Sequence, residues 1–325
     1  MALLLIIYSV ITTISVLILI IGLYQKNTNT ICQSKRRLDG KTVLVTGGTS
    51  GMGLEVATDF ARRGARVIVA CPFQEEGISG KESIIWNSGN KNVVFEHLDL
   101  SKYDSVKKFA ANIIENETRL DILVNNAGVS ISKITKDGFN MIMQVNYLGT
   151  ILLTFLLLPL LEKSGDEEEP SRIINTASVS HNVGKVDFDS WKTKTGIPFQ
   201  YYANSKLCLS LFTRELSKRL KGSKVVVNAI DPGVVGTRIY KIGTNYILGS
   251  LVVFFATYFS KDPWEGAQTA IHASVCEKAR KISGEYFFNC KVTKKTKLPW
   301  FNDIKVNKAL WDNTLEAIDQ KLPIN

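Results

Sequence analysis

Tyr202 and Lys206 are two side chains of this sequence whose types and spacing could do chemistry together. They stand four residues apart, so on a helix they would lie on one face, about a turn from each other. An adjacent cation favours the phenolate form of a tyrosine and lowers its pKa from about 10 towards neutrality. The pair could therefore exchange a proton with an alcohol oxygen near pH 7. Taken alone, such a pair more often belongs to a solvated helix face. The rest of the sequence has to show whether this pair is catalytic.

A glycine-rich turn predicts a dinucleotide site. A β-rich run at 41–46 leads directly into Gly47, Gly51 and Gly53, and a helical pattern follows as far as Arg63. Glycines let the backbone approach a pyrophosphate closely, and the start of a helix offers free N–H groups and a positive dipole end. The spacing is Gly-x-x-x-Gly-x-Gly rather than the common G-x-G-x-x-G, so a plain glycine-rich turn is the alternative.

Strand and helix patterns then alternate to the end of the chain. Strands are predicted at 65–70, 92–97, 121–125, 172–178, 224–230 and about 286–289. Residues 81–87 are predicted to be part of a helix, and further helices are predicted at 101–115 with Ser101 as the cap, 138–163, 202–222, 264–277 and about 307–320. This order predicts one doubly wound, Rossmann-type parallel sheet of about seven strands with helices on both faces. Ligands of such sheets bind at the carboxyl ends of the strands, where the motifs fall.

The section 148–161 of one predicted helix is almost wholly apolar. A second membrane span is one interpretation of this section. Asn146 and Pro159 favour a buried or subunit-facing helix instead, which leaves a homodimer open.

The N-terminus predicts a membrane anchor. Residues 2–24 carry no charge, and a helix of this length crosses a hydrocarbon core of roughly 30 Å. A cleaved signal peptide is the alternative, but it needs a basic N-terminal region and a small-residue cleavage site. The cations Lys26, Lys35, Arg36 and Arg37 place the rest of the chain on the cytosolic side. We expect a transmembrane helix over 1–25, a basic linker over 26–39 and a catalytic domain over 40–325.

The charge and cysteine content of the sequence limit the classes of molecule that the protein is expected to bind. Lys and Arg number 40 against 30 Asp and Glu, which gives a formal charge of +10. This charge suits an anionic membrane surface or an anionic cofactor, whereas no Arg-rich block, RNA-binding signature or zinc spacing favours nucleic acid or a metal. The five cysteines are widely spread without a C-x-x-C pair, which fits a reducing compartment better than a disulfide framework.

A set of short motifs runs along the chain in a fixed order. They are Thr-Gly-x-x-x-Gly-x-Gly at 46–53, Asp99, Asn-Asn-Ala-Gly at 125–128, Asn146, Ser178, Tyr202-x-x-x-Lys206 and Pro-Gly at 232–233. This is the order found in short-chain dehydrogenases/reductases, and the chain resembles that family over about residues 40–240. Further features are the N-terminal anchor, Ala70-Cys71, Ser-Val-Ser-His at 178–181, the long gap from Ser178 to Tyr202, and the segments 261–268 and 284–290. With these features the chain is similar to the membrane-anchored retinol dehydrogenase branch of the family, which implies the endoplasmic reticulum membrane.

The resemblance implies a role for each motif. Tyr202 would be the general acid and base, and Lys206 would lower its pKa and bond the nicotinamide ribose. Ser178 would hold the substrate oxygen, and Asn146 would position a water in the proton path. The implied cofactor-binding residues are Gly47, Thr49, Ser50, Gly51, Met52, Gly53, Asp99, Asn126, Ala127, Gly128, Tyr202, Lys206, Pro232, Gly233 and Thr237.

The second predicted strand bears on the choice between NADP(H) and NAD(H). An acid about 20 residues beyond the glycines would indicate NAD, and the strand end Ala70-Cys71-Pro72 has none. The retinol dehydrogenase branch usually has an arginine at the position of Pro72, where it pairs with the 2′-phosphate of NADP. Because Thr49 and Ser50 could still bond a phosphate, NADP(H) is favoured and NAD(H) is the alternative.

No charged residue occurs between Lys241 and Lys261, which predicts an apolar substrate lid over about 234–262. An ordinary buried helix pair is the alternative. We therefore predict a membrane-anchored oxidoreductase that interconverts a lipophilic, retinol-like alcohol and its aldehyde or ketone. A steroid, terpenoid or fatty aldehyde reductase is the alternative among enzymes. A catalytically idle, nucleotide-binding membrane scaffold is the alternative from another class.

Overall fold

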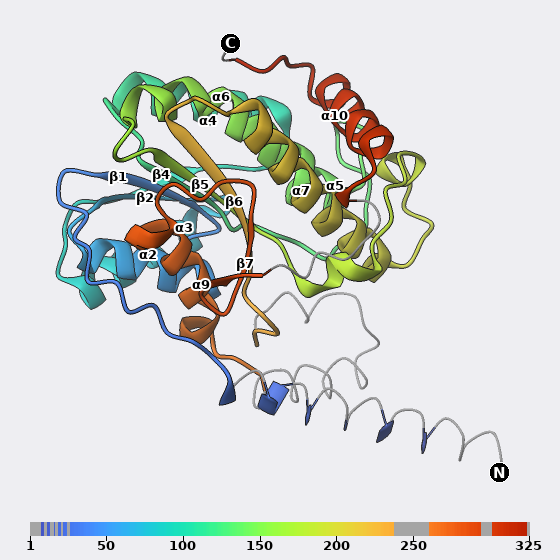
Figure 1. Cartoon of the computed structure of the whole chain (residues 1–325), viewed down its shortest axis with the longest axis horizontal. Helices are drawn as coiled ribbons and strands as arrows, with labels where there is room; N and C mark the ends of the chain where they lie inside the picture. The colour runs from blue at the N-terminus through green and yellow to red at the C-terminus, as the bar shows by residue number, and fades with distance from the viewer. Residues whose placement is uncertain are drawn as a thin grey trace.

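One eight-stranded sheet forms the centre of the computed structural model, which describes residues 27–236, 260–293 and 301–323 and scattered positions between 8 and 24. The strand order is β3-β2-β1-β4-β5-β6-β7-β8 (Figure 1). Neighbouring strands from β3 to β7 pair in parallel, and β8 runs antiparallel to β7. The strands are β1 (Thr42–Thr46), β2 (Arg66–Cys71), β3 (Val93–His97), β4 (Ile122–Asn125), β5 (Ser171–Thr176), β6 (Val225–Asp231), β7 (Tyr286–Phe288) and β8 (Lys291–Val292).

The strand that the sequence did not predict is β8. It has only two residues, too few for a pattern to be recognised. It can pair with β7 because Asn289 and Cys290 adopt φ angles of 47° and 57°, which reverse the chain within two residues. The doubly wound parallel sheet itself is confirmed.

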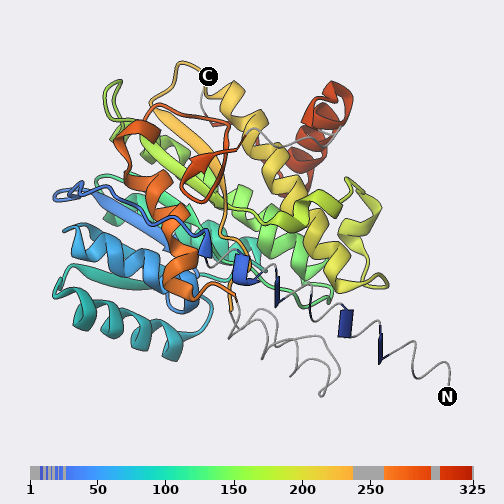
Figure 2. The ribbon, with the colours of Figure 1, turned by 60° about the horizontal axis from the view of Figure 1, so that its bottom comes forward.

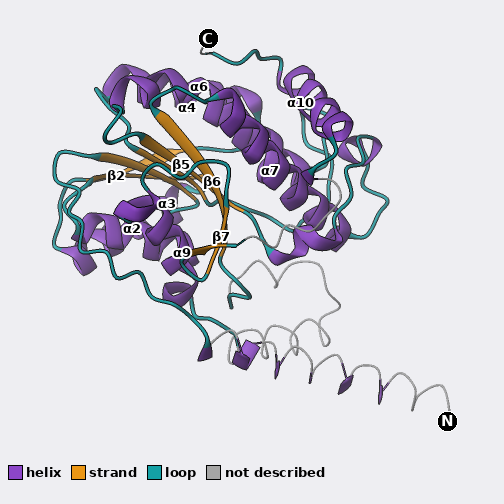
Figure 3. Cartoon of the chain, in the orientation of Figure 1, coloured by secondary structure: helices purple, strands orange, loops and turns teal. Residues whose placement is uncertain are grey.

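Helices cover both faces of the sheet, as predicted (Figures 1 and 3). In the turned view, the blue helices α2 and α3 lie on one side of the sheet, and α7 and α10 lie on the other (Figure 2). One face carries α2 (Gly51–Arg62), α3 (Gln74–Ser88) and α9 (Pro263–Val275). The other carries α4 (Tyr103–Asn116), α5 (Met141–Met143), α6 (Gly149–Ser164) and α7 (Pro198–Arg219), with α10 (Ile304–Ile318) packed outside α7.

The strand register brings the motifs to one edge of the sheet. Thr46 of β1 pairs with Asn125 of β4, and Asn125 pairs with Asn175 of β5. Thr176 of β5 pairs with Ile230 of β6. The turns that follow β1, β4, β5 and β6 therefore lie side by side at the carboxyl ends of the strands. This is the edge at which ligands of doubly wound sheets bind.

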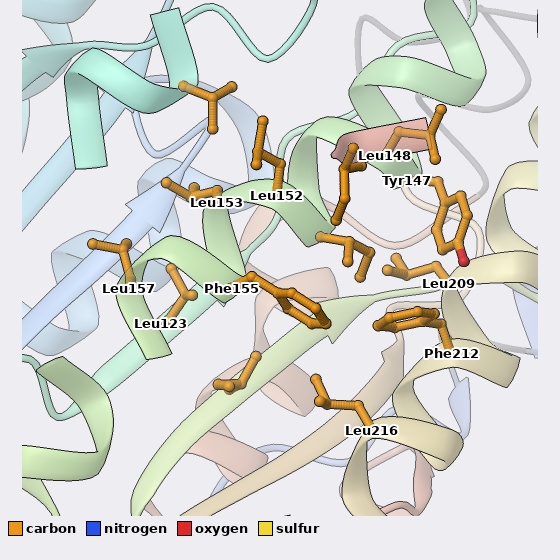
Figure 4. Close-up of a cluster of buried hydrophobic side chains, with 14 of the residues drawn as sticks. Leu123, Tyr147, Leu148, Leu152, Leu153, Phe155, Leu157, Leu209, Phe212 and Leu216 are labelled. Carbon is orange, nitrogen blue, oxygen red and sulfur yellow. The ribbon is translucent and has the colours of Figure 1, made fainter. Parts of the chain in front are cut away.

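The apolar helix of the second half is a core element. α5, a π-helical turn at Gln144–Leu148 and α6 form one continuous helix. Its most apolar stretch has a mean hydropathy of 1.8, and 89% of that stretch is buried inside the protein. The side chains of Phe155 on α6 and Phe212 on α7 lie close together in the layer between helices and sheet, with ring centroids 6.0 Å apart (Figure 4). This burial supports the core-helix interpretation over a second membrane span.

Several predicted helix starts are wrong. The helix α7 begins at Pro198 rather than at 202, and α10 begins at Ile304 rather than at about 307. The helix expected from Gly138 begins at Met141, because Gly138 has a φ of 85° and ends a tight turn on Thr135. Ser101 does not cap α4, whose N-cap is Lys102, without a side-chain cap bond. The Ser101 hydroxyl donates instead to Asp99 Oδ1 at 2.6 Å, which turns the chain before the helix begins.

The stretch from Thr28 to Leu38, just before β1, is bonded to the body of the protein. The described positions between 8 and 24 are helical, and Tyr8 and Tyr24 are 71% and 68% exposed. Beyond them, the Cys32 N–H donates to Gln268 Oε1 at 3.1 Å, and Asn289 Nδ2 donates to Thr28 O at 3.2 Å. Residues 237–259, which hold most of the predicted lid, lie outside the described residues.

Candidate active site

The glycine turn between β1 and α2 is closed too tightly for larger residues. Gly47 and Gly51 have φ angles of 61° and 53°, in the left-handed region that favours glycine. A Cβ on Gly53 would lie 2.1 Å from Gly47 O and 2.4 Å from Asn126 Nδ2. The N-cap of α2, Ser50, gives no side-chain hydrogen bond to the first turn of the helix. Uncapped N–H groups behind a tight glycine turn fit a pyrophosphate.

The hydroxyls of this turn are directed towards the next helix. Thr49 Oγ1 and Ser50 Oγ donate to the same carboxylate oxygen, Glu76 Oε1, at 3.0 and 2.9 Å. Met52 of α2 is buried in the core between that helix and the sheet. The sequence predicted Thr49, Ser50 and Met52 as cofactor residues, but Glu76 was missed because it lies beyond the end of the second strand.

The turn after β4 is bonded to the glycine turn. The backbone N–H groups of Asn126 and Ala127 both donate to Thr46 Oγ1 at 3.1 Å. Asn126 Nδ2 donates to Thr46 O at 3.1 Å and to Gly47 O at 3.2 Å. Asn126 to Gly128 therefore form one unit with the glycine turn, as a shared dinucleotide site requires.

Asp99 lies two residues beyond β3 at the same edge. Its carboxylate accepts the Ser101 hydroxyl and lies 2.6 Å from Lys102 Nζ. Burial alone would raise the pKa of Asp99, but the hydrogen bonds from Lys102 and Ser101 together hold it below its usual range. The carboxylate is thus kept charged at the edge of the sheet where the dinucleotide is predicted to bind.

Lys206 is buried beneath Tyr202 and bonded to the end of β5. Its Nζ donates to Thr176 O at 2.7 Å and lies 5.6 Å from the centre of the Tyr202 ring. The side chain is only 3% exposed, and this burial lowers the pKa of Lys206 to about 8. Because Thr176 is two residues before Ser178, the bond brings the Tyr202 helix against the predicted substrate serine.

Ser178 begins a 3-10 turn, Val179–Val183, that is bonded to the start of α7, where Gln200 Nε2 donates to Val183 O at 3.1 Å. Within this turn His181 Nδ1 lies 2.6 Å from Ser178 O. The Tyr286 hydroxyl lies 3.2 Å from the same nitrogen and donates to Asp231 Oδ2 at 3.1 Å. Burial is the largest cause that raises the pKa of Tyr286. The charge of Asp231 and, less strongly, the charge of Tyr202 raise it further. Ser178 is thus linked through His181 to the buried hydroxyl of Tyr286.

Tyr286 and Asp231 were missed as part of this centre because they lie 55 residues apart in the sequence. The turn after β6 joins the network through Asp231, whose Oδ1 accepts the Gly233 N–H at 2.9 Å. Gly233 has a φ of 82°, and Pro232 precedes it at the same edge of the sheet. Thr237 lies outside the described residues.

Asn146 lies in the π-helical turn that precedes α6. Its Oδ1 accepts the Val129 N–H at 2.8 Å, and its Nδ2 donates to Val129 O at 3.0 Å and to Ser205 Oγ at 3.2 Å. The Ser205 hydroxyl donates in turn to Tyr202 O at 2.7 Å. The irregular turn therefore holds the loop after β4 and the Tyr202 helix together, and such π segments are frequent at functional sites.

Replacing Lys206 with methionine is expected to raise the free energy of unfolding at pH 7 by about 1–3 kcal/mol. The folded chain lowers the pKa of Lys206 from 10.5 to about 8, so the buried charge costs stability below pH 8. Between pH 8 and 10.5 the unfolded state binds more protons than the folded state, and wild-type stability rises with pH. Urea unfolding at pH 7 and 10 measures this difference.

The exposed Lys221, replaced by methionine, is the matched control for the Lys206 variant. Its stability is expected to stay within about 0.5 kcal/mol of the wild type at both pH values. A Lys206→Met protein less stable than the wild type at pH 7, or equally affected at both pH values, contradicts the prediction.

Comparisons with known proteins agree with this geometry. The family model for short chain dehydrogenase matches residues 41–244. Retinol dehydrogenase 13 of Homo sapiens is 40% identical over 304 residues, which cover 91% of this chain and 90% of that protein. Retinol dehydrogenase 12 of Bos taurus is 38% identical over 291 residues, which cover 89% of each chain.

A solved structure supports the same assignment. The active-site complex of RhlG with NADP from Pseudomonas aeruginosa has a TM-score of 0.62 and 28% identity, covering 77% of this chain and 95% of that one. Sequence and fold therefore lead to one family. The chain belongs to the short-chain dehydrogenase family, in its retinol dehydrogenase branch, and is an NAD(P)-dependent oxidoreductase that acts on CH–OH groups.

Proposed function

We propose that this protein is a membrane-anchored enzyme of the endoplasmic reticulum, with its catalytic domain in the cytosol, that interconverts a retinol-like lipophilic alcohol and its aldehyde. The observation that carries the proposal is the bond from Lys206 Nζ to Thr176 O. It holds a buried cation under the Tyr202 ring and at the end of β5, two residues before Ser178, at the edge where the glycine turn lies. The names of the two retinol dehydrogenases support the substrate class.

Four side chains take part in the proposed proton transfer. In the reductive direction Tyr202 gives its proton to the carbonyl oxygen of the substrate, and in the oxidative direction it removes the proton from the alcohol. Lys206 favours the phenolate that this transfer leaves, because its charge lies close to the ring in a low-dielectric site. Ser178 donates a hydrogen bond to the substrate oxygen. Asn146 orders a water in the path by which Tyr202 exchanges its proton with solvent.

The residues around the glycine turn would hold a nicotinamide dinucleotide, which supplies or accepts the hydride at the substrate carbon. The first N–H groups of α2 would bind its pyrophosphate, and Asp99 would lie at its adenine end. Lys206 would bond its nicotinamide ribose. Pro232 and Gly233, with Thr237, would hold its nicotinamide end.

The membrane side of the proposal rests on two contacts of Asn289. Its Nδ2 donates to Thr28 O at the base of the N-terminal segment, and its Oδ1 accepts from Lys261 Nζ at 2.8 Å. Lys261 also pairs with Val235, in a bridge between two residues that flank the segment 237–259. Residues next to the predicted anchor and residues that flank the predicted lid are thus bonded to the same side chain, Asn289, or to its partner Lys261. A lipophilic substrate could then pass from the bilayer to the site beneath the lid.

A turnover assay on membranes that carry the full chain tests the function. We expect reduction of retinal in membranes washed with alkaline carbonate, because a spanning helix resists this extraction. A steroid ketone and a long-chain aldehyde in the same assay separate the alternative substrates. Membranes without the chain are the control. Loss of the protein into the wash contradicts the anchor, and cofactor binding without turnover of any carbonyl favours the scaffold.

A further inference from the structure

The carboxylate of Glu76 lies on the glycine turn, where a negative charge bears on the choice between NAD(H) and NADP(H). Glu76 Oε1 accepts both the Thr49 and Ser50 hydroxyls, whereas its Oε2 accepts no hydrogen bond from the described residues. Glu76 is partly buried in the first turn of α3. It makes no ion pair within the part of the chain that the structure describes. One charged oxygen of Glu76 is therefore unpaired and available to a ligand.

The fold, rather than a flexible side chain, sets the position of Glu76. A Cβ on Gly80, one turn further along α3, would lie 2.8 Å from both the Cα and the carbonyl oxygen of Thr49. The backbone of α3 thus rests directly on the glycine turn. The first turn of α3 is held there, and a carboxylate at residue 76 meets the hydroxyls of that turn.

This position corresponds to the ribose end of the dinucleotide. The Gly47 N–H donates to Ala70 O at 2.7 Å, so the glycine turn lies beside the end of β2. In doubly wound folds an acid about 20 residues beyond the glycines bonds the ribose 2′-hydroxyl of NAD. Glu76 stands 23 residues after Gly53. It lies in α3 and not at the end of β2. An acid is expected at that strand end, where the chain has Pro72, and for this reason the sequence pattern did not identify Glu76.

A 2′-phosphate would meet the wrong partners at this place. The Thr49 and Ser50 hydroxyls, which could have bonded a phosphate, donate to Glu76. A phosphate ester carries up to two negative charges and would lie against the carboxylate. Like charges in contact disfavour binding strongly, whereas a ribose diol can donate hydrogen bonds to the free Glu76 oxygen.

We propose that Glu76 makes this protein select NAD(H) over NADP(H), by bonding the ribose diol and repelling a 2′-phosphate. The proposal rests on the proposed function only in that a nicotinamide dinucleotide binds at the glycine turn. It replaces the NADP(H) preference that the sequence favoured, because the two hydroxyls behind that preference already have an anionic partner. The chain would then differ from RhlG, whose solved complex contains NADP.

Dissociation constants of NADH and NADPH test the proposal without turnover. They are measured by fluorescence on the full chain in detergent, with no carbonyl substrate present. The wild type is expected to bind NADH at least about tenfold more tightly than NADPH. Glu76→Gln is expected to reduce this ratio about tenfold, because it keeps the size and removes the charge. Glu76→Arg is expected to reverse the preference, because a cation pairs with the phosphate.

Glu75→Gln is the matched control, since Glu75 is an exposed acid of the same helix turn. It removes the same charge one residue away and is expected to leave the ratio unchanged. If Glu76 only joined α3 to the glycine turn, Glu76→Gln would weaken both cofactors equally, and the proposal would be overturned. Wild-type preference for NADPH also overturns it, but leaves the proposed oxidoreductase function intact. Binding of neither dinucleotide overturns both.

Discussion

Replacing Tyr202 with phenylalanine is expected to lower kcat by about 10³-fold or more, while the dissociation constant of the dinucleotide changes less than about threefold. The variant loses one hydroxyl and no ring, and Lys206 keeps its bond to Thr176 O. The reaction loses its proton donor and acceptor, whereas the glycine turn is untouched. Retinal turnover in membranes and cofactor binding, measured on the same preparations, check the two halves of the prediction.

Tyr201 supplies a control one residue away. Its hydroxyl lies 2.8 Å from Thr193 Oγ1 and accepts the Gly196 N–H at 3.0 Å, so it holds the loop before α7. Tyr201→Phe is expected to cost about 1 kcal/mol of stability and to keep kcat within a few-fold. Equal losses of kcat in both variants would indicate damage to α7. A Tyr202→Phe enzyme that keeps its activity would show that Tyr202 is not the general acid and base.

Replacing Gly53 with alanine is expected to weaken dinucleotide binding by at least about 100-fold. The added Cβ would lie 2.1 Å from Gly47 O, so the start of α2 has to move away from the turn. The N–H groups that would hold the pyrophosphate move with it, and Asn126 loses its place against the same turn. Fluorescence titration with NADH measures the loss, and thermal unfolding shows whether the rest of the fold persists.

Gly89→Ala is the control for the glycine variant. Gly89 ends α3 with a φ of 73°, and a Cβ there would meet no atom within 4 Å. The change is expected to cost about 1 kcal/mol through backbone strain and to leave dinucleotide affinity as it is. Comparable affinity losses in the two variants, or normal binding by Gly53→Ala, would show that the close approach at Gly53 is not required.

The sheet was predictable because its signals are local. Each parallel strand is a short run that contains β-branched or aromatic residues, and each is followed by a turn residue or a polar motif. The same holds for the pair Tyr202 and Lys206, whose spacing alone placed them on one helix face. Ser101 shows the limit of such signals. Its sequence context is that of a cap, yet the nearby Asp99 carboxylate accepts its hydroxyl.

The amino-acid sequence by itself determined the order of the elements, the glycine turn and the chemical types gathered along one edge, because periodicity and motif spacing act within a few residues. Only the tertiary structure decided which partners these groups meet. Lys206 bonds Thr176 O, Tyr286 joins Asp231 and His181, and Glu76 faces Thr49 and Ser50. These contacts depend on how strands and helices far apart in the chain pack together, and no local pattern of residues encodes that packing.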